Sequence, residues 1–107
     1  MTNLLRFLPE LQEDAFTGYV WYEAKATGLG EDFLQMFYTY TGEISKNPFL
    51  YPKVHGEIRR CLLRRFPYAL YFRIEGNEIT VLGLFHCARD PRTIIAEMRE
   101  RETPNNS

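Results

Sequence analysis

The sequence contains few of the features that would assign a protein to a specialised class. Only two of its 107 residues are cysteines, Cys61 and Cys87, which is too few for a disulfide framework or a metal cluster. No stretch approaches the roughly 18 apolar residues of a membrane span, and Met1 to Glu10 lacks the apolar segment of a signal peptide. We therefore expect reduced thiols, a cytoplasmic location, no metal and no other cofactor.

A strong net charge is also lacking. The formal net charge of -1 and the pI near 6.1 argue against a protein that binds nucleic acid through its overall charge. Lysines are few and scattered, at Lys25, Lys46 and Lys53. A hydrophobic fraction of 45% suits one globular domain, which we place at residues 1–102, followed by a polar, disordered tail at residues 103–107.

Hydrophobic periodicity predicts two helices in the first half of the chain. A short strand at residues 3–8 precedes a helix at residues 10–26, and a second helix runs over residues 31–46. Residues 47–56 contain two prolines and are expected to be irregular. The predicted core-facing residues of the helices are Leu11, Ala15, Gly18, Tyr22, Phe33, Phe37, Tyr40 and Ile44, with Val20, Trp21 and Ala24 widening the stripe of the first helix.

After residue 56 the hydrophobic period changes from helical to alternating. Alternation predicts strands at residues 57–63, 68–74 and 78–86, and a short helix from Asp90 to about Arg101. This order predicts an α+β fold in which a helical hairpin packs on one face of a mainly antiparallel four-stranded sheet, β-α-α-β-β-β with a short C-terminal helix. The other face of the sheet is expected to be open.

Arginines are concentrated in this second half, with no acidic residue between Glu57 and Glu75. Guanidinium groups bind carboxylates and phosphates equally well, so the arginines and His86 are expected to line the open face. The predicted partner-binding residues are Arg59, Arg60, Arg65, Tyr68, Arg73, His86 and Arg89.

Six short motifs follow one another in a specific order along the chain. They are F-x-P-E at Phe7 to Glu10, W-Y-E at Trp21 to Glu23, G-L-G-x-x-F at Gly28 to Phe33, N-P-x-x-Y-P at Asn47 to Pro52, R-R-x-L-L-x-R-F-P-Y at Arg59 to Tyr68, and H-x-x-R-D-P at His86 to Pro91. Together they resemble the RelE/ParE toxin superfamily, and more closely its ParE-like branch of plasmid stabilisation proteins. The resemblance covers nearly all of residues 7–92.

This resemblance implies the toxin of a type II toxin-antitoxin module, neutralised by a cognate antitoxin. ParE-like relatives inhibit DNA gyrase by binding and are not enzymes, whereas RelE-like relatives cut mRNA on the ribosome. In the RelE-like branch an arginine typically follows the tyrosine of the middle strand, but here Ala69 follows Tyr68. The resemblance therefore favours gyrase inhibition. A ribosome-dependent mRNA interferase, with the ribosome and mRNA as partners, and another or inactive specificity stay open as alternatives. As a metal-free endoribonuclease, such an interferase would use His86 and Glu57 as acid and base, with a phosphate clamp of Arg60, Arg65, Arg73 and Arg89.

Overall fold

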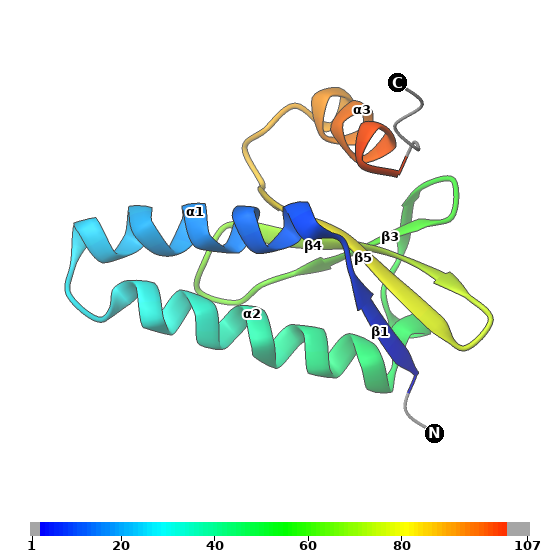
Figure 1. The fold of residues 1–107 in the computed structure, drawn as a ribbon, viewed down its shortest axis with the longest axis horizontal. Coiled ribbons are helices and arrows are strands. Elements are labelled where there is room, and N and C mark those ends of the chain that lie inside the picture. Colours follow the sequence, from blue (N-terminus) through cyan, green and yellow to red (C-terminus); the bar gives the residue numbers. More distant parts are fainter. Residues whose placement is uncertain (1–2, 103–107) are drawn as a thin grey trace.

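The computed structural model describes residues 3–102, which form a mixed sheet with helices on both faces (Figure 1). The elements are β1 (Leu4–Phe7), α1 (Pro9–Lys25), α2 (Leu29–Lys46), the 3-10 helix η1 (Pro48–Leu50), β2 (Lys53–His55), β3 (Ile58–Leu62), β4 (Tyr68–Glu75), β5 (Glu78–His86) and α3 (Pro91–Glu102). The strand order is β1-β5-β4-β3-β2, with only β1 and β5 parallel. The predicted α+β fold is confirmed, and the predicted tail lies outside the described residues.

The sheet has five strands where the sequence predicted four. The additional strand, β2, lies in the segment that was expected to be irregular, and it pairs with β3 through Lys53 and His55. The prolines of this segment do not prevent the pairing, because Pro48 begins η1 and Pro52 precedes β2. Neither position requires a ladder N–H group, and the carbonyl of Pro52 accepts a hydrogen bond from the amide of Arg60 at 3.1 Å.

Helices α1 and α2 form a tight hairpin whose turn is held by a side chain. The carboxylate of Glu23 accepts hydrogen bonds from the amides of Gly28 and Gly30, each at 2.9 Å. These bonds satisfy N–H groups at the start of α2 that have no partner within the helix. Farther along, a Cβ on Gly18 would lie 2.4 Å from the Phe33 ring, so the two helices approach each other where α1 has no side chain.

The larger hydrophobic core lies between this hairpin and the sheet. Edge-to-face ring contacts connect Tyr22 and Phe33 to Phe66, with centroids 4.8 and 5.3 Å apart. The predicted helix stripes are buried here, apart from the half-buried Tyr40. Val20, Trp21 and Ala24 were expected to widen the buried stripe, but all three are exposed, Trp21 to 54%. Neighbouring residues on a helix point about 100° apart, and Tyr22 occupies the inward direction.

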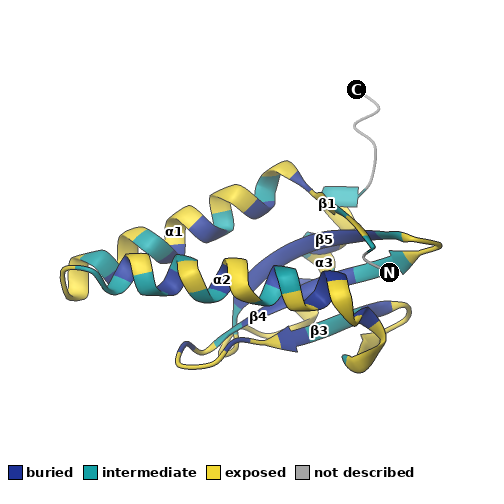
Figure 2. Ribbon diagram, turned by 90° about the horizontal axis from the view of Figure 1, so that it is seen from below, coloured by how far each residue is buried: buried dark blue, intermediate teal, exposed yellow. Residues whose placement is uncertain are grey.

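A second, smaller core corrects the prediction of an open sheet face. Helix α3 packs on the face opposite the hairpin (Figures 1 and 2), where Ile94 and Met98 contact sheet residues such as Tyr71. Strand β5 supplies both cores because it is buried on both faces (Figure 2). A β-bulge at Leu82 adds one more apolar side chain to the smaller core.

Arg101 of α3 ties this helix to the rest of the molecule. Its guanidinium donates hydrogen bonds to both carboxylate oxygens of Asp14 in α1, at 2.6 and 2.8 Å, and to the carbonyl of Leu82 at 3.0 Å. Gly83 makes room for it, since a Cβ there would lie 2.7 Å from the guanidinium. Only 8% of the Arg101 side chain and 13% of the Asp14 side chain are exposed. Arg101 therefore joins α1, β5 and α3.

Candidate functional site

The predicted cationic residues do not form one surface, because alternation divides them between the two faces of the sheet. Arg59 lies on the hairpin side of β3, where it donates a hydrogen bond to the carbonyl of Tyr51 at 2.6 Å and lies over the Phe49 ring. Arg60 lies on the α3 side, in contact with a cleft beside Ile94 and Ile95. Arg59 and Arg60 are adjacent in sequence but therefore lie on opposite faces of the sheet.

Three of the other predicted arginines form ion pairs within the chain. The pairs are Arg65 with Asp32 at 3.3 Å, Arg73 with Glu102, and Arg89 with Glu97 at 2.9 Å. Arg73 also lies 3.5 Å from a carboxylate oxygen of Glu75. The cationic surface predicted from the sequence is therefore largely neutralised by carboxylates that come from distant parts of the chain.

Arg60 is the exception among the predicted partner-binding arginines inside the sheet. It is half-buried, and within residues 3–102 it forms no hydrogen bond through its side chain and no ion pair. Its cleft, of about 50 Å³, is otherwise lined by Val54, Tyr71, Pro91, Ile94 and Ile95. A guanidinium between apolar walls binds a carboxylate or phosphate more strongly than a fully solvated one, so the surroundings of Arg60 suit an anionic group.

The open edge of β3 begins beside Arg60. Strand β2 pairs only with the first part of β3, at Ile58 and Arg59. The amide of Leu63 bonds to the carbonyl of Tyr68 on β4, so the peptide groups of the preceding residue, Leu62, point outward by alternation. The Leu62 side chain is 56% exposed. A partner segment could therefore pair with this edge while its carboxylate reaches Arg60.

A second cleft, of about 180 Å³, lies where β5 ends. Its lining residues are Asp14, Thr17, Tyr68, Leu84, Phe85, His86 and Arg89. His86 accepts a hydrogen bond at Nδ1 from the amide of Ala88 at 3.0 Å, so a neutral His86 carries its proton on Nε2. In that form the ring can donate a hydrogen bond from Nε2 but has no free nitrogen to accept a proton.

The other polar groups of this cleft have defined states. Desolvation raises the pKa of Tyr68, so its hydroxyl stays protonated at neutral pH, and its ring contacts His86 edge-on at 5.1 Å. Asp14 already accepts bonds from Arg101 and from the amide of Leu84 at 3.1 Å. Its carboxylate is therefore used to hold the fold together and is not available as a base.

The residues predicted for an endoribonuclease are not brought together. In the paired strands Leu62 lies opposite Ala69, and Ala69 lies opposite Phe85. His86, the next residue of β5, therefore lies at the same height along the strands as the residue that follows Leu62. Glu57 lies six residues from that level, about 20 Å along the strand at 3.3 Å per residue. Arg73 pairs with Thr80 and lies about 17 Å away by the same rise. Of the predicted set, only His86 and Arg89 share a cleft.

Some residues of these sites had no signal in the sequence. Leu62 belongs to an alternating strand, and only the short length of β2 leaves it exposed. Thr17 is an ordinary polar residue of α1 until β5 is placed beside it. Within residues 3–102, no group of three or more histidine, cysteine or acidic side chains is arranged to hold a metal ion, and no helix is long and apolar enough to cross a lipid bilayer.

Sequence comparison with known families gives no match, either to a family model or to a curated protein. Comparison of the fold with solved structures does. The chromosomal ParDE toxin-antitoxin system of P. aeruginosa aligns with a TM-score of 0.68 at 20% identity, over 79% of this chain and 96% of that chain. The RelBE2 toxin-antitoxin complex of Mycobacterium tuberculosis aligns at 0.56 with 16% identity, over 80% and 99%.

A mutant of the E. coli toxin RelE in its free state aligns over 96% of this chain and 100% of that chain, with a TM-score of 0.58 and 14% identity. At these identities the likeness shows a shared fold. The chain therefore has the α+β fold of RelE and ParE toxins, and the resemblance indicated by the six motifs is confirmed at that level. Among these three structures the ParDE system has the highest TM-score, in keeping with the ParE-like motifs.

Proposed function

We propose that this chain is the toxin of a type II toxin-antitoxin module, that a cognate antitoxin neutralises it in the cytoplasm, and that it inhibits DNA gyrase by binding. The fold supports the first part, because the three similar structures are toxins or toxin-antitoxin assemblies. The ParE-like motifs support gyrase as the target. In this proposal the protein acts by occupying a surface of its target and catalyses no reaction.

The residues that an endoribonuclease would need lie far apart in the structure. This observation supports the part of the proposal that the protein acts by binding and not by catalysis. Cleavage of RNA without a metal requires a base, an acid and cations around one phosphate. Here Glu57 and Arg73 lie far along the sheet from His86. His86 has one nitrogen engaged by the backbone, and Arg89 is paired with Glu97. Such an arrangement suits binding better than acid-base chemistry.

For the antitoxin we propose an acidic and apolar segment that lies along β3. Its carboxylate would pair with Arg60, its apolar side chain would contact Leu62, and its backbone would extend the sheet at the open edge. Of the other predicted partner-binding residues, Arg59 belongs to β3 itself, whereas Tyr68 and His86 line the cleft at the end of β5. Arg65, Arg73 and Arg89 would have to exchange their internal carboxylates to take part.

Supercoiling and DNA-cleavage assays with purified gyrase test the target. We expect the chain to inhibit supercoiling and to trap cleaved DNA in proportion to its concentration, and the cognate antitoxin to reverse both effects. Normal supercoiling with no trapped break at a large excess of this chain would exclude gyrase as the target.

The mRNA interferase is the second candidate, because the cleft at the end of β5 does bring a histidine, an arginine and a tyrosine together. His86 could donate a hydrogen bond there from Nε2, with Arg89 neutralising a phosphate if Glu97 released it. A translating extract distinguishes the two functions. Transcripts cut on the ribosome, and left intact by a His86→Gln variant, would support the interferase, whereas intact transcripts with the unaltered chain would exclude it.

A further inference from the structure

The two most exposed large apolar side chains of the described residues are neighbours in sequence. Leu50 is 75% exposed and Phe49 is 70% exposed, and both belong to η1. Within the described residues neither joins a hydrophobic core, so the fold does not explain two large apolar side chains at this position. Exposed apolar surface of this kind marks sites of protein interaction. We call Phe49 and Leu50 the apolar dyad.

The residues around the apolar dyad hold it in place. Pro48 is buried before it, and the ring of Tyr51 after it packs edge-on against Phe72 of the larger core, with centroids 5.9 Å apart. The guanidinium of Arg59 lies over the Phe49 ring at 5.2 Å and donates a hydrogen bond to the carbonyl of Tyr51 at 2.6 Å. Side chains that are already ordered lose little entropy on binding, so the dyad is preorganised as an anchor.

The charges beside the dyad are mostly positive. Lys46 ends α2 just before it, and within residues 3–102 neither Lys46 nor Arg59 pairs with a carboxylate. Lys53 follows the dyad and lies 3.2 Å from Glu57. Glu43, in the last turn of α2, offsets part of this positive charge. The complementary surface of a partner therefore has an apolar pocket with carboxylates at its rim.

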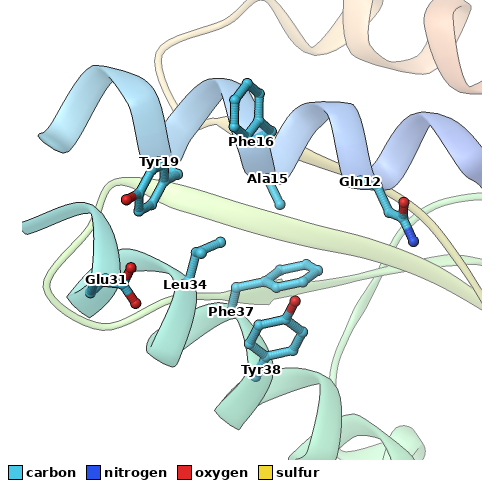
Figure 3. A pocket seen from close by; sticks show the side chains of 8 residues that line it. All are labelled: Gln12, Ala15, Phe16, Tyr19, Glu31, Leu34, Phe37 and Tyr38. Atoms are coloured by element: carbon cyan, nitrogen blue, oxygen red, sulfur yellow. The ribbon is translucent and has the colours of Figure 1, made fainter. Parts of the chain in front are cut away.

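The same charge argument separates the dyad from the other strongly exposed aromatic side chains. Phe16 and Tyr38 flank a groove of about 520 Å³ between α1 and α2 (Figure 3), and its described lining residues include Glu31 but no lysine or arginine. A pocket with an acidic rim would be repelled there. Residues 46–73, which contain the dyad, carry seven basic side chains and one acidic one. Of these aromatic surfaces, the dyad is the one that suits an acidic partner.

We propose that the apolar dyad is the anchor through which this chain binds DNA gyrase. Phe49 and Leu50 enter an apolar pocket of gyrase, and Lys46 and Arg59 pair with carboxylates at its rim. This inference rests on the proposed function and names the surface that the function uses. Arg59 lies on the hairpin side of β3 and Arg60 on the α3 side, so gyrase and the antitoxin contact different faces of one strand, and a bound antitoxin excludes gyrase by its bulk.

Other occupants fit the dyad less well. Two dyads from two copies of this chain, placed face to face, would bring like charges together. A nucleic acid would need aromatic rings for its bases and many cations for its phosphates, whereas Leu50 has no ring and the cations beside the dyad are few. An anionic lipid surface would use the same apolar and cationic groups, and vesicle binding distinguishes it.

Supercoiling and DNA-cleavage assays with purified gyrase test the dyad. We expect Phe49→Ser and Leu50→Ser each to raise the concentration needed for half-inhibition at least about tenfold. Lys46→Glu should raise it about threefold, as for a charge at the rim of an interface. Isothermal titration calorimetry should show an affinity for the cognate antitoxin within about twofold of that of the unaltered chain for all three variants.

Two substitutions away from the dyad serve as matched controls. Leu4 is 65% exposed on β1, at the opposite edge of the sheet from β2, and Lys25 is exposed in the last turn of α1. Leu4→Ser and Lys25→Glu should inhibit gyrase as strongly as the unaltered chain does. Lys25→Glu changes the net charge by the same amount as Lys46→Glu, so a difference between them is local. Circular dichroism verifies that each variant is folded.

The possible results separate this inference from the proposed function. Dyad variants that inhibit gyrase as strongly as the unaltered chain would overturn the inference and leave the proposed function intact. No inhibition by the unaltered chain would overturn both. Loss of antitoxin binding in Phe49→Ser would also overturn the inference, by assigning the dyad to the antitoxin. Binding of the unaltered chain to phosphatidylglycerol vesicles that Phe49→Ser abolishes, with gyrase inhibition unchanged, would assign the dyad to a lipid surface instead.

Discussion

At the scale of single residues, Arg60 and Arg73 show how position separates similar side chains. Both are half-buried arginines on the α3 face of neighbouring strands, yet Arg73 is paired with Glu102 and Arg60 has no partner within residues 3–102. Replacing Arg60 therefore breaks no side-chain hydrogen bond or ion pair within residues 3–102. Arg60 is therefore the residue through which antitoxin binding can be tested most directly.

We expect Arg60→Glu to leave thermal stability unchanged while weakening the complex with the cognate antitoxin by about 2 to 5 kcal/mol, as for a charge pair in a partly desolvated contact. Isothermal titration calorimetry measures the affinity. Arg92→Glu is the control, because the Arg92 side chain is 91% exposed and paired only with its neighbour Asp90. An Arg60→Glu complex as tight as that of the unaltered chain would place the antitoxin elsewhere.

Gly18 and Gly42 form a second contrast, since both lie inside helices. A Cβ on Gly18 would lie 2.4 Å from the Phe33 ring, whereas a Cβ on Gly42 would meet no atom within 4 Å. We expect Gly18→Ala to lower the free energy of unfolding by about 1 to 3 kcal/mol through overpacking. Gly42→Ala should raise it by about 0.5 to 1 kcal/mol, because alanine favours the helix. Urea denaturation measures both, and equal effects would contradict this packing of α1 on α2.

At the scale of elements, the attachment of α3 depends on Arg101. We expect Arg101→Met to lower the free energy of unfolding by about 3 kcal/mol, the lower end of the range for breaking a buried ion pair, because α3 can lift and let water reach Asp14. Amide hydrogen exchange should increase most in α3. Arg92→Ala, on the exposed side of the same helix, should change little. Combining Arg101→Met with Asp14→Leu should restore part of the loss. Equal stability of the Arg101→Met and Arg92→Ala variants would contradict the anchoring role.

Acid should loosen α3 before it unfolds the sheet. Desolvation tends to raise the pKa of Glu97, but the bonds from Arg89 and Arg101 outweigh it and hold this pKa below its ordinary 4.5. The bond from Arg92 likewise lowers the pKa of Asp90 below its ordinary 3.8. A lowered carboxyl pKa gives stability that is present above the ordinary value and is lost as the pH falls through the lowered one. The loss should therefore begin below pH 4.5.

Methyl NMR resonances of Ile94 and Met98, which pack under α3, measure this loosening as the pH is lowered from about 6 to about 3. We expect their shifts to move toward solvent-exposed values before those of Ile79 in the larger core. A Glu97→Gln variant should show a weaker pH dependence. Simultaneous changes in both cores would mean that α3 and the sheet respond to acid as one unit.

At the scale of the whole molecule, a near-neutral net charge conceals two oppositely charged halves. Residues 9–46 carry seven acidic and two basic side chains, whereas the rest of the chain carries eleven basic and seven acidic ones. The halves of neighbouring molecules should attract each other at low ionic strength, since screening is weak when the Debye length exceeds about 10 Å.

Static light scattering near pH 7 tests this attraction. We expect the second virial coefficient to be more negative at about 20 mM than at about 200 mM NaCl, because salt screens the attraction between unlike halves. The double variant Glu13→Lys, Glu43→Lys should show a smaller effect of salt, as it reduces the acidity of the hairpin. Attraction that strengthens with salt would indicate apolar association instead.

Much of the fold could be predicted because it depends on local pattern. The helical period of Leu11, Ala15 and Tyr22 and the alternation of β4 and β5 follow from which residues must leave water, and these elements are where the sequence placed them. Strand β2 was missed because three exposed residues carry no hydrophobic alternation. It forms only because β3 offers it a hydrogen-bonding edge.

The candidate site depended much more on tertiary structure. By itself the sequence determined the class of fold, the helical hairpin and the abundance of arginine beside the last strands, since composition and period are local properties. Only the tertiary structure decided that α3 covers the second face, that Arg65, Arg73 and Arg89 meet carboxylates, and that Arg60 does not. The reason is physical: a charge becomes a binding site or an internal ion pair according to which distant side chain folding brings within about 4 Å, and strand patterns carry no record of that partner.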